Sequence, residues 1–155
     1  MDIPAELSVM VTAALPVSEL RGAIPLGVVK FGLPVFKTYV LAVIGNLIPV
    51  IPLLIFLEPV SQKLRRFKLW DRFFEWLCRR TRKRAEIVEK YEAIGLALFV
   101  AIPLPVTGAW TGSVAGLLFR IKFKYAFPAI ICGVLIAGVV VTTLTLGGKH
   151  LLGIL

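Results

Sequence analysis

Two long runs of apolar residues without a charged side chain constrain this chain more than any other feature. Residues 38–57 form a run of 20 and residues 125–148 a run of 24, and neither contains Asp, Glu, Lys or Arg. At about 1.5 Å of helical rise per residue, each run can cross a hydrocarbon core about 30 Å thick. The chain is 58% hydrophobic and only 17% charged, whereas about a quarter of the residues in a soluble domain are charged. We therefore expect an all-α integral membrane protein, with residues 1–155 forming one membrane domain.

Two further apolar blocks, residues 3–33 and 93–119, are interrupted near their centres by proline and glycine. The interruptions read "ALPVSELRGAIPLG" from Ala14 and "AIPLPVTGAWTGSVAG" from Ala101. Proline opens the hydrogen bonding of a helix, and irregular backbone persists at membrane depth only inside protein or beside a water-filled cavity. We expect each block to be a re-entrant helical hairpin that enters and leaves the bilayer on one side.

The distribution of basic residues favours hairpins over full crossings. Residues 58–92 carry eleven of the 18 Lys and Arg residues, and such clusters mark the cytoplasmic side. If both broken blocks crossed, five basic residues would face the opposite side: Lys30, Lys37, Arg120, Lys122 and Lys124. With hairpins, the last three of these join the cytoplasmic side. The expected location is the cell membrane, with several passes, a cytoplasmic segment 58–92 and both termini outside.

Segment 58–92 also has apolar residues three or four positions apart, which predicts an amphipathic helix. We interpret it as lying on the cytoplasmic membrane face, where anionic lipids attract it. An ordinary solvated linker is the alternative, and nucleic-acid binding is not expected because the segment is tethered between two spans. The side chains expected to contact the membrane surface are Phe67, Trp70, Phe73, Trp76, Arg79 and Arg80.

The chain also resembles itself when it is shifted by 87 residues. Ala14-Leu15-Pro16 then meets Ala101-Ile102-Pro103, and Phe36-Lys37 meets Phe123-Lys124. The shift pairs hairpin with hairpin and span with span. It predicts an inverted repeat like those of many secondary transporters. The first unit would be residues 1–57, with hairpin 3–33 and span 38–57. The second would be residues 93–148, with hairpin 93–119 and span 125–148.

A charged pair, Glu19 and Arg21, falls where the first hairpin should have its tip. Charged side chains at membrane depth are costly and are functional candidates by default, although a purely structural pair that pins the tip is the alternative. Poor solvation favours the protonated form of a carboxyl group, so Glu19 is a candidate for proton coupling. Arg21 offers a permanently charged fork suited to a phosphate or carboxylate.

The second hairpin carries no charge at its expected tip, but it offers hydroxyl and backbone groups that could complete a site. The substrate-binding residues expected from both hairpins are Glu19, Arg21, Pro25, Pro103, Pro105, Thr107, Gly108, Trp110 and Thr111. The sequence contains no phosphate loop, no metal-ligand spacing and no nucleophile paired with a base. We therefore expect neither an enzyme nor a metal or cofactor.

The strings "SELRGAIPLG" and "YEAIGLALFVAIPLPVTGAWTG" resemble the small multidrug export protein family, which is itself related to the DedA superfamily of membrane proteins. The resemblance implies two opposed re-entrant hairpins and proton-coupled movement of polyprenyl phosphate or other phospholipids. It aligns Glu19, Arg21 and Pro25 with acidic, basic and proline positions of the first hairpin. The second hairpin lacks the arginine that DedA proteins carry there.

Three functions follow from these observations. The first is a transporter that moves an anionic lipid, such as a polyprenyl phosphate, with proton coupling. The second is a proton-coupled exporter of small lipophilic drugs, which Arg21 would oppose if the drug were a cation. The third is a membrane scaffold or assembly protein. Because so few helices enclose only a narrow path, we also expect a homodimer surrounded by membrane lipids.

Overall fold

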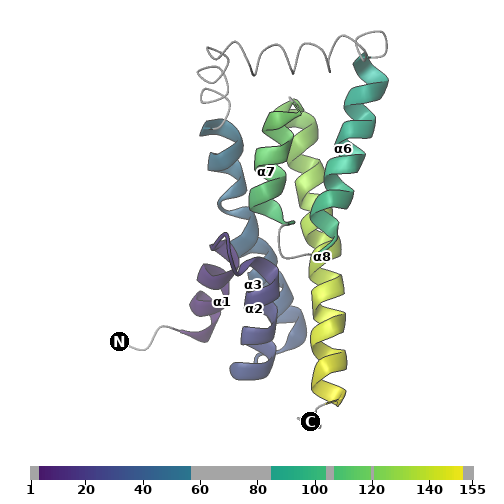
Figure 1. Ribbon diagram of the computed structural model, residues 1–155. Coiled ribbons are helices and arrows are strands. Elements are labelled where there is room, and N and C mark those ends of the chain that lie inside the picture. Colours follow the sequence, from purple (N-terminus) through teal and green to yellow (C-terminus); the bar gives the residue numbers. More distant parts are fainter. Residues whose placement is uncertain (1–3, 57–84, 104–106, 120, 152–155) are drawn as a thin grey trace.

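The computed structural model describes residues 4–56, 85–103, 107–119 and 121–151, and within these ranges the chain is almost entirely helical with no strand (Figure 1). Its helices are α1 (Ala5–Ala14), α2 (Glu19–Pro25), the π-helix η1 (Leu26–Lys30), α3 (Val35–Leu47), α6 (Ala85–Ala101), α7 (Ala109–Leu118) and α8 (Phe123–Leu151). The expectation of an all-α chain is confirmed for the described residues.

The first half of the chain is an antiparallel pair, α1 and α2, followed by a long helix. α1 ends at Ala14 because Leu15, which precedes Pro16, takes an extended conformation with φ −76° and ψ 138°. α2 then runs back and widens at Pro25, which cannot donate a backbone hydrogen bond, into the π-helix η1. α3 begins beyond a short turn and continues past the tip of the pair (Figure 1).

The second half of the chain contains a second antiparallel pair, α6 and α7, followed by the long helix α8. α6 ends at Ala101, directly before Ile102-Pro103, and α7 returns antiparallel to it (Figure 1). α6 begins at Ala85, so the helix extends into the segment 58–92 that the sequence assigns to the linker. The two helical pairs lie at opposite ends of the molecule, and their turns meet at mid-height between α3 and α8.

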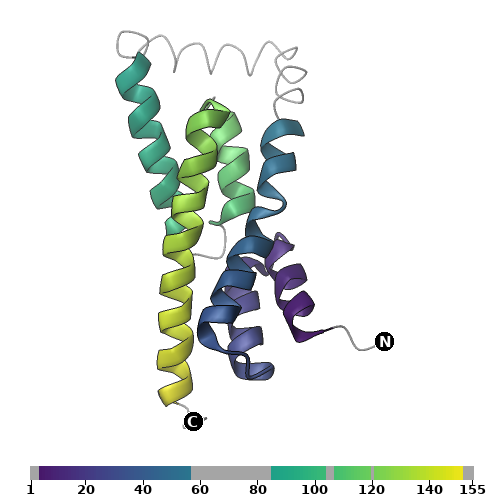
Figure 2. The same ribbon diagram turned by 180° about the vertical axis from the view of Figure 1, so that it is seen from behind.

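Two long helices run antiparallel through the molecule: α8, and the helix that begins with α3 and continues to Phe56. α8 contacts α2, α3, α6 and α7 along its length (Figure 2), and the Tyr39 hydroxyl on α3 donates a hydrogen bond of 3.0 Å to the Leu135 carbonyl on α8. The helix containing α3 is interrupted at residues 48–49 and resumes at 50–56. Pro49 explains the interruption, because proline cannot donate a backbone hydrogen bond within the helix.

Glycines let the first helix of each pair approach its long neighbour. A β-carbon added to Gly45 of α3 would overlap the backbone of Met10 in α1. A β-carbon on Gly133 of α8 would come within 2.7 Å of the Ala97 carbonyl in α6. Small residues allow this kind of backbone contact between helices in lipid. An ion pair of 2.8 Å between Lys37 and Glu6 adds a polar contact between α3 and α1.

Among the described residues, two helices are long and apolar enough to cross a membrane, Val35–Phe56 and Phe123–Leu151. These helices correspond to the predicted spans 38–57 and 125–148, apart from Leu57, which lies outside the described residues. Their outer faces remain apolar: on α8, the exposed side chains include Ile136, Val139 and Leu144. Apolar helices with apolar outer faces suit a bilayer rather than water.

Candidate functional site

Glu19 lies at mid-height, where the turns of the two helical pairs meet. It is the first residue of α2, and it is only 6% exposed. Its backbone has φ +46°, the only positive φ among the described non-glycine residues. A side chain other than glycine rarely adopts this left-handed conformation. Backbone strain of this kind is concentrated at functional sites, so this conformation makes Glu19 a candidate functional residue.

The Glu19 carboxylate binds the N-terminus of α7, which belongs to the other half of the chain. The backbone N–H of Trp110 donates a hydrogen bond to Glu19 Oε1 at 3.3 Å. Gly108, the N-cap residue of α7, lies so close that a β-carbon there would overlap the carboxylate. Helix N-termini present unpaired N–H groups and a partial positive charge, so a carboxylate is a favourable partner.

Trp110 joins the two turns a second time through its side chain. The indole Nε1–H donates a hydrogen bond of 3.0 Å to the carbonyl of Ala14, the last residue of α1. Carbonyls at a helix C-terminus lack partners within the helix, so this bond satisfies one of them. Trp110 therefore binds both Glu19, through its backbone, and Ala14, through its ring.

Two threonine hydroxyl groups donate hydrogen bonds to backbone carbonyls near the second turn, which is the connection between α6 and α7. The Thr107 hydroxyl donates to the Ile102 carbonyl, and the Thr111 hydroxyl donates to the Gly108 carbonyl at 3.3 Å. These residues shape the turn where α6 ends and α7 begins.

A small pocket lies beside Glu19, with room for about one water molecule. It is lined by both halves of the chain: Glu19, Leu20 and Arg21 of α2, Asn46 of α3, Val100 of α6, Pro103, Thr107 and Gly108 between α6 and α7, Ala109 of α7, and Val134, Ala137 and Val141 of α8. The charged members are Glu19 and Arg21. The site is therefore a small pocket with two charged side chains and mostly apolar surroundings.

Most of the predicted substrate-binding residues lie at this junction. Five of them, Glu19, Arg21, Pro103, Thr107 and Gly108, line the pocket, and Trp110 binds across it. Two others do not line it: Pro25 lies at the C-terminal end of α2, and Thr111 is exposed on α7.

The remaining predicted residues fall outside the described ranges. Pro105 is one of them, and the others are the membrane-surface residues Phe67, Trp70, Phe73, Trp76, Arg79 and Arg80. Within the described ranges, no group of three His, Cys, Asp or Glu side chains could hold a metal ion.

Asn46 is a member of the pocket that the sequence analysis does not select. Its side chain is buried, with 1% exposed, on the face of α3 that meets the pocket. The sequence contains a signal for it, because an amide in the middle of an uncharged apolar run is costly in lipid unless it has a partner. What the sequence lacks is any indication that Asn46 lines the same pocket as Glu19.

Comparison with known proteins gives one match. The model of the family described as "Putative small multi-drug export protein" matches residues 19–140, a range that begins at Glu19 and includes the whole pocket apart from Val141. Neither the curated proteins nor the solved structures contain a match to the chain.

Proposed function

Because the chain belongs to the small multi-drug export protein family, we propose that it exports small lipophilic compounds across a membrane in exchange for protons, with Glu19 as the proton-binding residue. The observation that carries the proposal is the position of the Glu19 carboxylate. It is buried at the junction of the two halves and binds the N-terminus of a helix from the other half.

The proposal includes a membrane arrangement with two opposed re-entrant hairpins, α1–α2 and α6–α7. Each pair spans about half the length of the molecule, and the two turns meet at its centre (Figure 1). The internal shift of 87 residues supports an inverted repeat, since α1 ends at Ala14 and α6 ends at Ala101. Transporters of this class bind their substrates at the midplane, between broken helices.

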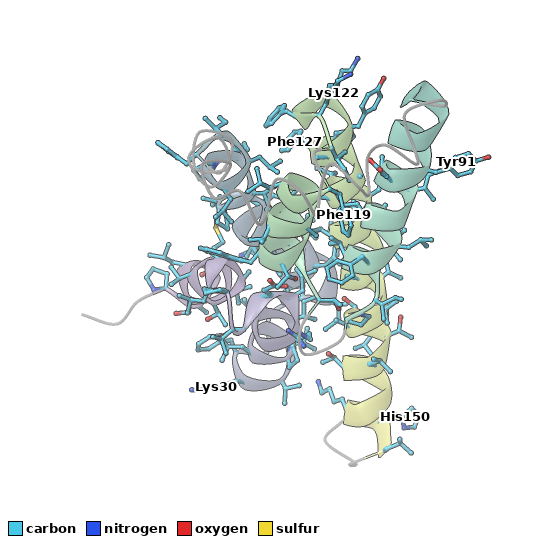
Figure 3. The ribbon with its side chains drawn as sticks, turned by 45° about the horizontal axis from the view of Figure 1, so that its top comes forward. Lys30, Tyr91, Phe119, Lys122, Phe127 and His150 are labelled. Atoms are coloured by element: carbon cyan, nitrogen blue, oxygen red, sulfur yellow. The ribbon has the colours of Figure 1, made fainter. Side chains whose placement is uncertain are left out.

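The orientation we propose has segment 58–92 in the cytoplasm and both termini outside. Figure 3 places Lys122 at one end of the molecule and Lys30 and His150 at the other. The cytoplasmic end then carries Lys122 together with the eleven basic residues of segment 58–92. This arrangement satisfies the positive-inside rule.

Protonation of Glu19 gives a physical route to coupling. The ionised carboxylate holds the N-terminus of α7, and a negative charge is what that N-terminus stabilises. Protonation removes the charge and weakens the contact between the two turns. The pocket, which has room for about one water molecule in this conformation, must widen before a drug-sized compound enters. Separation of the two turns is the opening step. Loss of the proton on the other side of the membrane restores the contact between Glu19 and α7.

The test is transport of a fluorescent lipophilic cation into proteoliposomes under an imposed pH gradient. Wild-type protein should accumulate the cation, and Glu19→Gln should abolish the accumulation because the amide cannot exchange a proton. Glu6→Gln is the matched control, since Glu6 is a carboxylate on α1 that lies outside the pocket. An inert wild-type protein, or a Glu19→Gln variant with full activity, would contradict the proposal.

A second candidate function is transport of an anionic lipid such as a polyprenyl phosphate. The observation in its favour is Arg21, whose permanent charge lines the pocket and suits a phosphate. In liposomes that contain a labelled polyprenyl phosphate, this function predicts headgroup movement that Arg21→Ala removes. Drug export predicts no headgroup movement. In either case we propose a homodimer, because a path for such a substrate is wider than this pocket.

A further inference from the structure

Asn46 carries a buried oxygen atom that the proposed cycle does not yet use. Its side-chain Oδ1 has no hydrogen-bond partner among the described residues, although the residue is 1% exposed. A buried polar atom without a partner is costly, so a native example calls for an explanation. Asn46 lines the same pocket as Glu19, which suggests where its partner lies.

The pocket has the size and the chemistry to supply that partner. It has room for about one water molecule, and a buried water needs two to four polar neighbours. The Asn46 oxygen and the Glu19 carboxylate both accept hydrogen bonds, and one water has two O–H groups to donate. Thr107 also lines the pocket.

We propose that Asn46 and Glu19 hold one water molecule between them, and that this water delivers the proton to Glu19. The proposal rests on the proposed function, in which Glu19 is protonated once in each cycle. In the transfer, the O–H bond directed at Glu19 breaks and a carboxyl O–H forms. The water oxygen takes a replacement proton from bulk water on its other side, so the water is regenerated.

The charges around the pocket explain why an amide suits this role. Among the described lining residues, Glu19 and Arg21 are the charged groups, and both come from α2. The residues from α3, α6, the second turn and α8 are uncharged. Asn46 can therefore orient a neutral water without adding a charge that would compete with Glu19 or Arg21. It acts as a positioning residue, through the water rather than on the transported compound.

The test compares Asn46→Leu with Thr38→Val in the pH-gradient transport assay. Thr38 is the matched control, because its Oγ1 is also buried on α3 without a partner among the described residues, and it does not line the pocket. Asn46→Leu should slow proton-driven transport several-fold and shift its pH profile, whereas Thr38→Val should match wild type. Equal pH profiles for the two variants would overturn the proposal.

Two further measurements keep the outcome interpretable. If Glu19→Gln abolishes proton-driven transport while Asn46→Leu keeps the wild-type rate and pH profile, the water-mediated proposal fails and the proposed function stands. If Glu19→Gln alone retains proton-driven transport, the proposed function fails as well. A measurement on wild type avoids any folding defect: infrared difference spectra on a pH jump should contain an O–H band that shifts in ¹⁸O-labelled water. Absence of that band would also overturn the proposal.

Discussion

The Glu19 carboxylate lies against the α-carbon of Gly108, so close that no side chain fits at position 108. The two residues come from opposite halves of the chain, and their contact joins the start of α2 to the N-cap of α7. A glycine is required here for space rather than for backbone conformation, because its φ of 166° is an extended value. This contact links Glu19, the proton-binding residue of the proposed function, to the second pair of helices.

Gly108→Ala should therefore displace the carboxylate and destabilise the protein by about 1–3 kcal/mol, the usual cost of overpacking. Gly95→Ala is the matched control, because a β-carbon at this α6 position meets nothing within 4 Å. That change should be neutral or stabilise by up to about 1 kcal/mol, as alanine favours a helix. Unfolding of the two purified variants by denaturant in detergent measures the difference. A Gly108→Ala variant as stable as Gly95→Ala would contradict the contact.

Trp110→Phe tests the second link between the turns. The substitution keeps the backbone N–H that binds Glu19, but it removes the indole N–H that binds the Ala14 carbonyl, at a cost of about 1 kcal/mol. Tyr39→Phe is the comparison, because it removes a side-chain hydrogen bond between α3 and α8. Both should lower stability, whereas only Trp110→Phe should alter the transport rate. Equal transport rates in the two variants would contradict the prediction that the Trp110 side chain takes part in the movement of the turns.

Labelling of single cysteines tests the membrane arrangement. After Cys78 and Cys132 are replaced by serine, Lys30→Cys and Lys122→Cys should react with a membrane-impermeant maleimide from opposite sides of the membrane. The physical reason is that the two positions lie at opposite ends of the molecule (Figure 3), which the proposed re-entrant hairpins would put on opposite faces of the membrane. Reaction of both from the same side would exclude the hairpins, and with them the midplane position of Glu19.

Gly133→Ala tests the close packing of α6 on α8. The new β-carbon would come within 2.7 Å of the Ala97 carbonyl and 2.6 Å of Val100, so we expect a loss of about 1–3 kcal/mol. Gly147→Ala, on the same helix, meets nothing within 4 Å and should be neutral or slightly stabilising. Thermal unfolding of the two variants in detergent distinguishes them. If Gly133→Ala raises the midpoint as Gly147→Ala does, the helices are farther apart than the structure has them.

The long helices, the interruption at Pro49 and the ends of α1 and α6 follow from local sequence. An uncharged run of 20 or more apolar residues is long enough to cross a bilayer wherever it occurs. Pro49 interrupts its helix for a reason that lies within one turn of the chain. The same reasoning explains why α1 ends before Pro16 and α6 before Pro103. Each of these features depends on residues that are neighbours in the chain.

One partner of Glu19 was decided by the tertiary structure. The sequence suggests Arg21, two residues away, and the folded chain adds a hydrogen bond from the backbone of Trp110, 91 residues away. A free N–H group at a helix end has no residue type of its own, so no motif reveals it. Asn46 joins Glu19 in one pocket for a similar reason, because α2 and α3 bring together positions that no spacing relates. Sequence alone determined which groups are too polar for lipid, and only the packing of helices decided which of them meet.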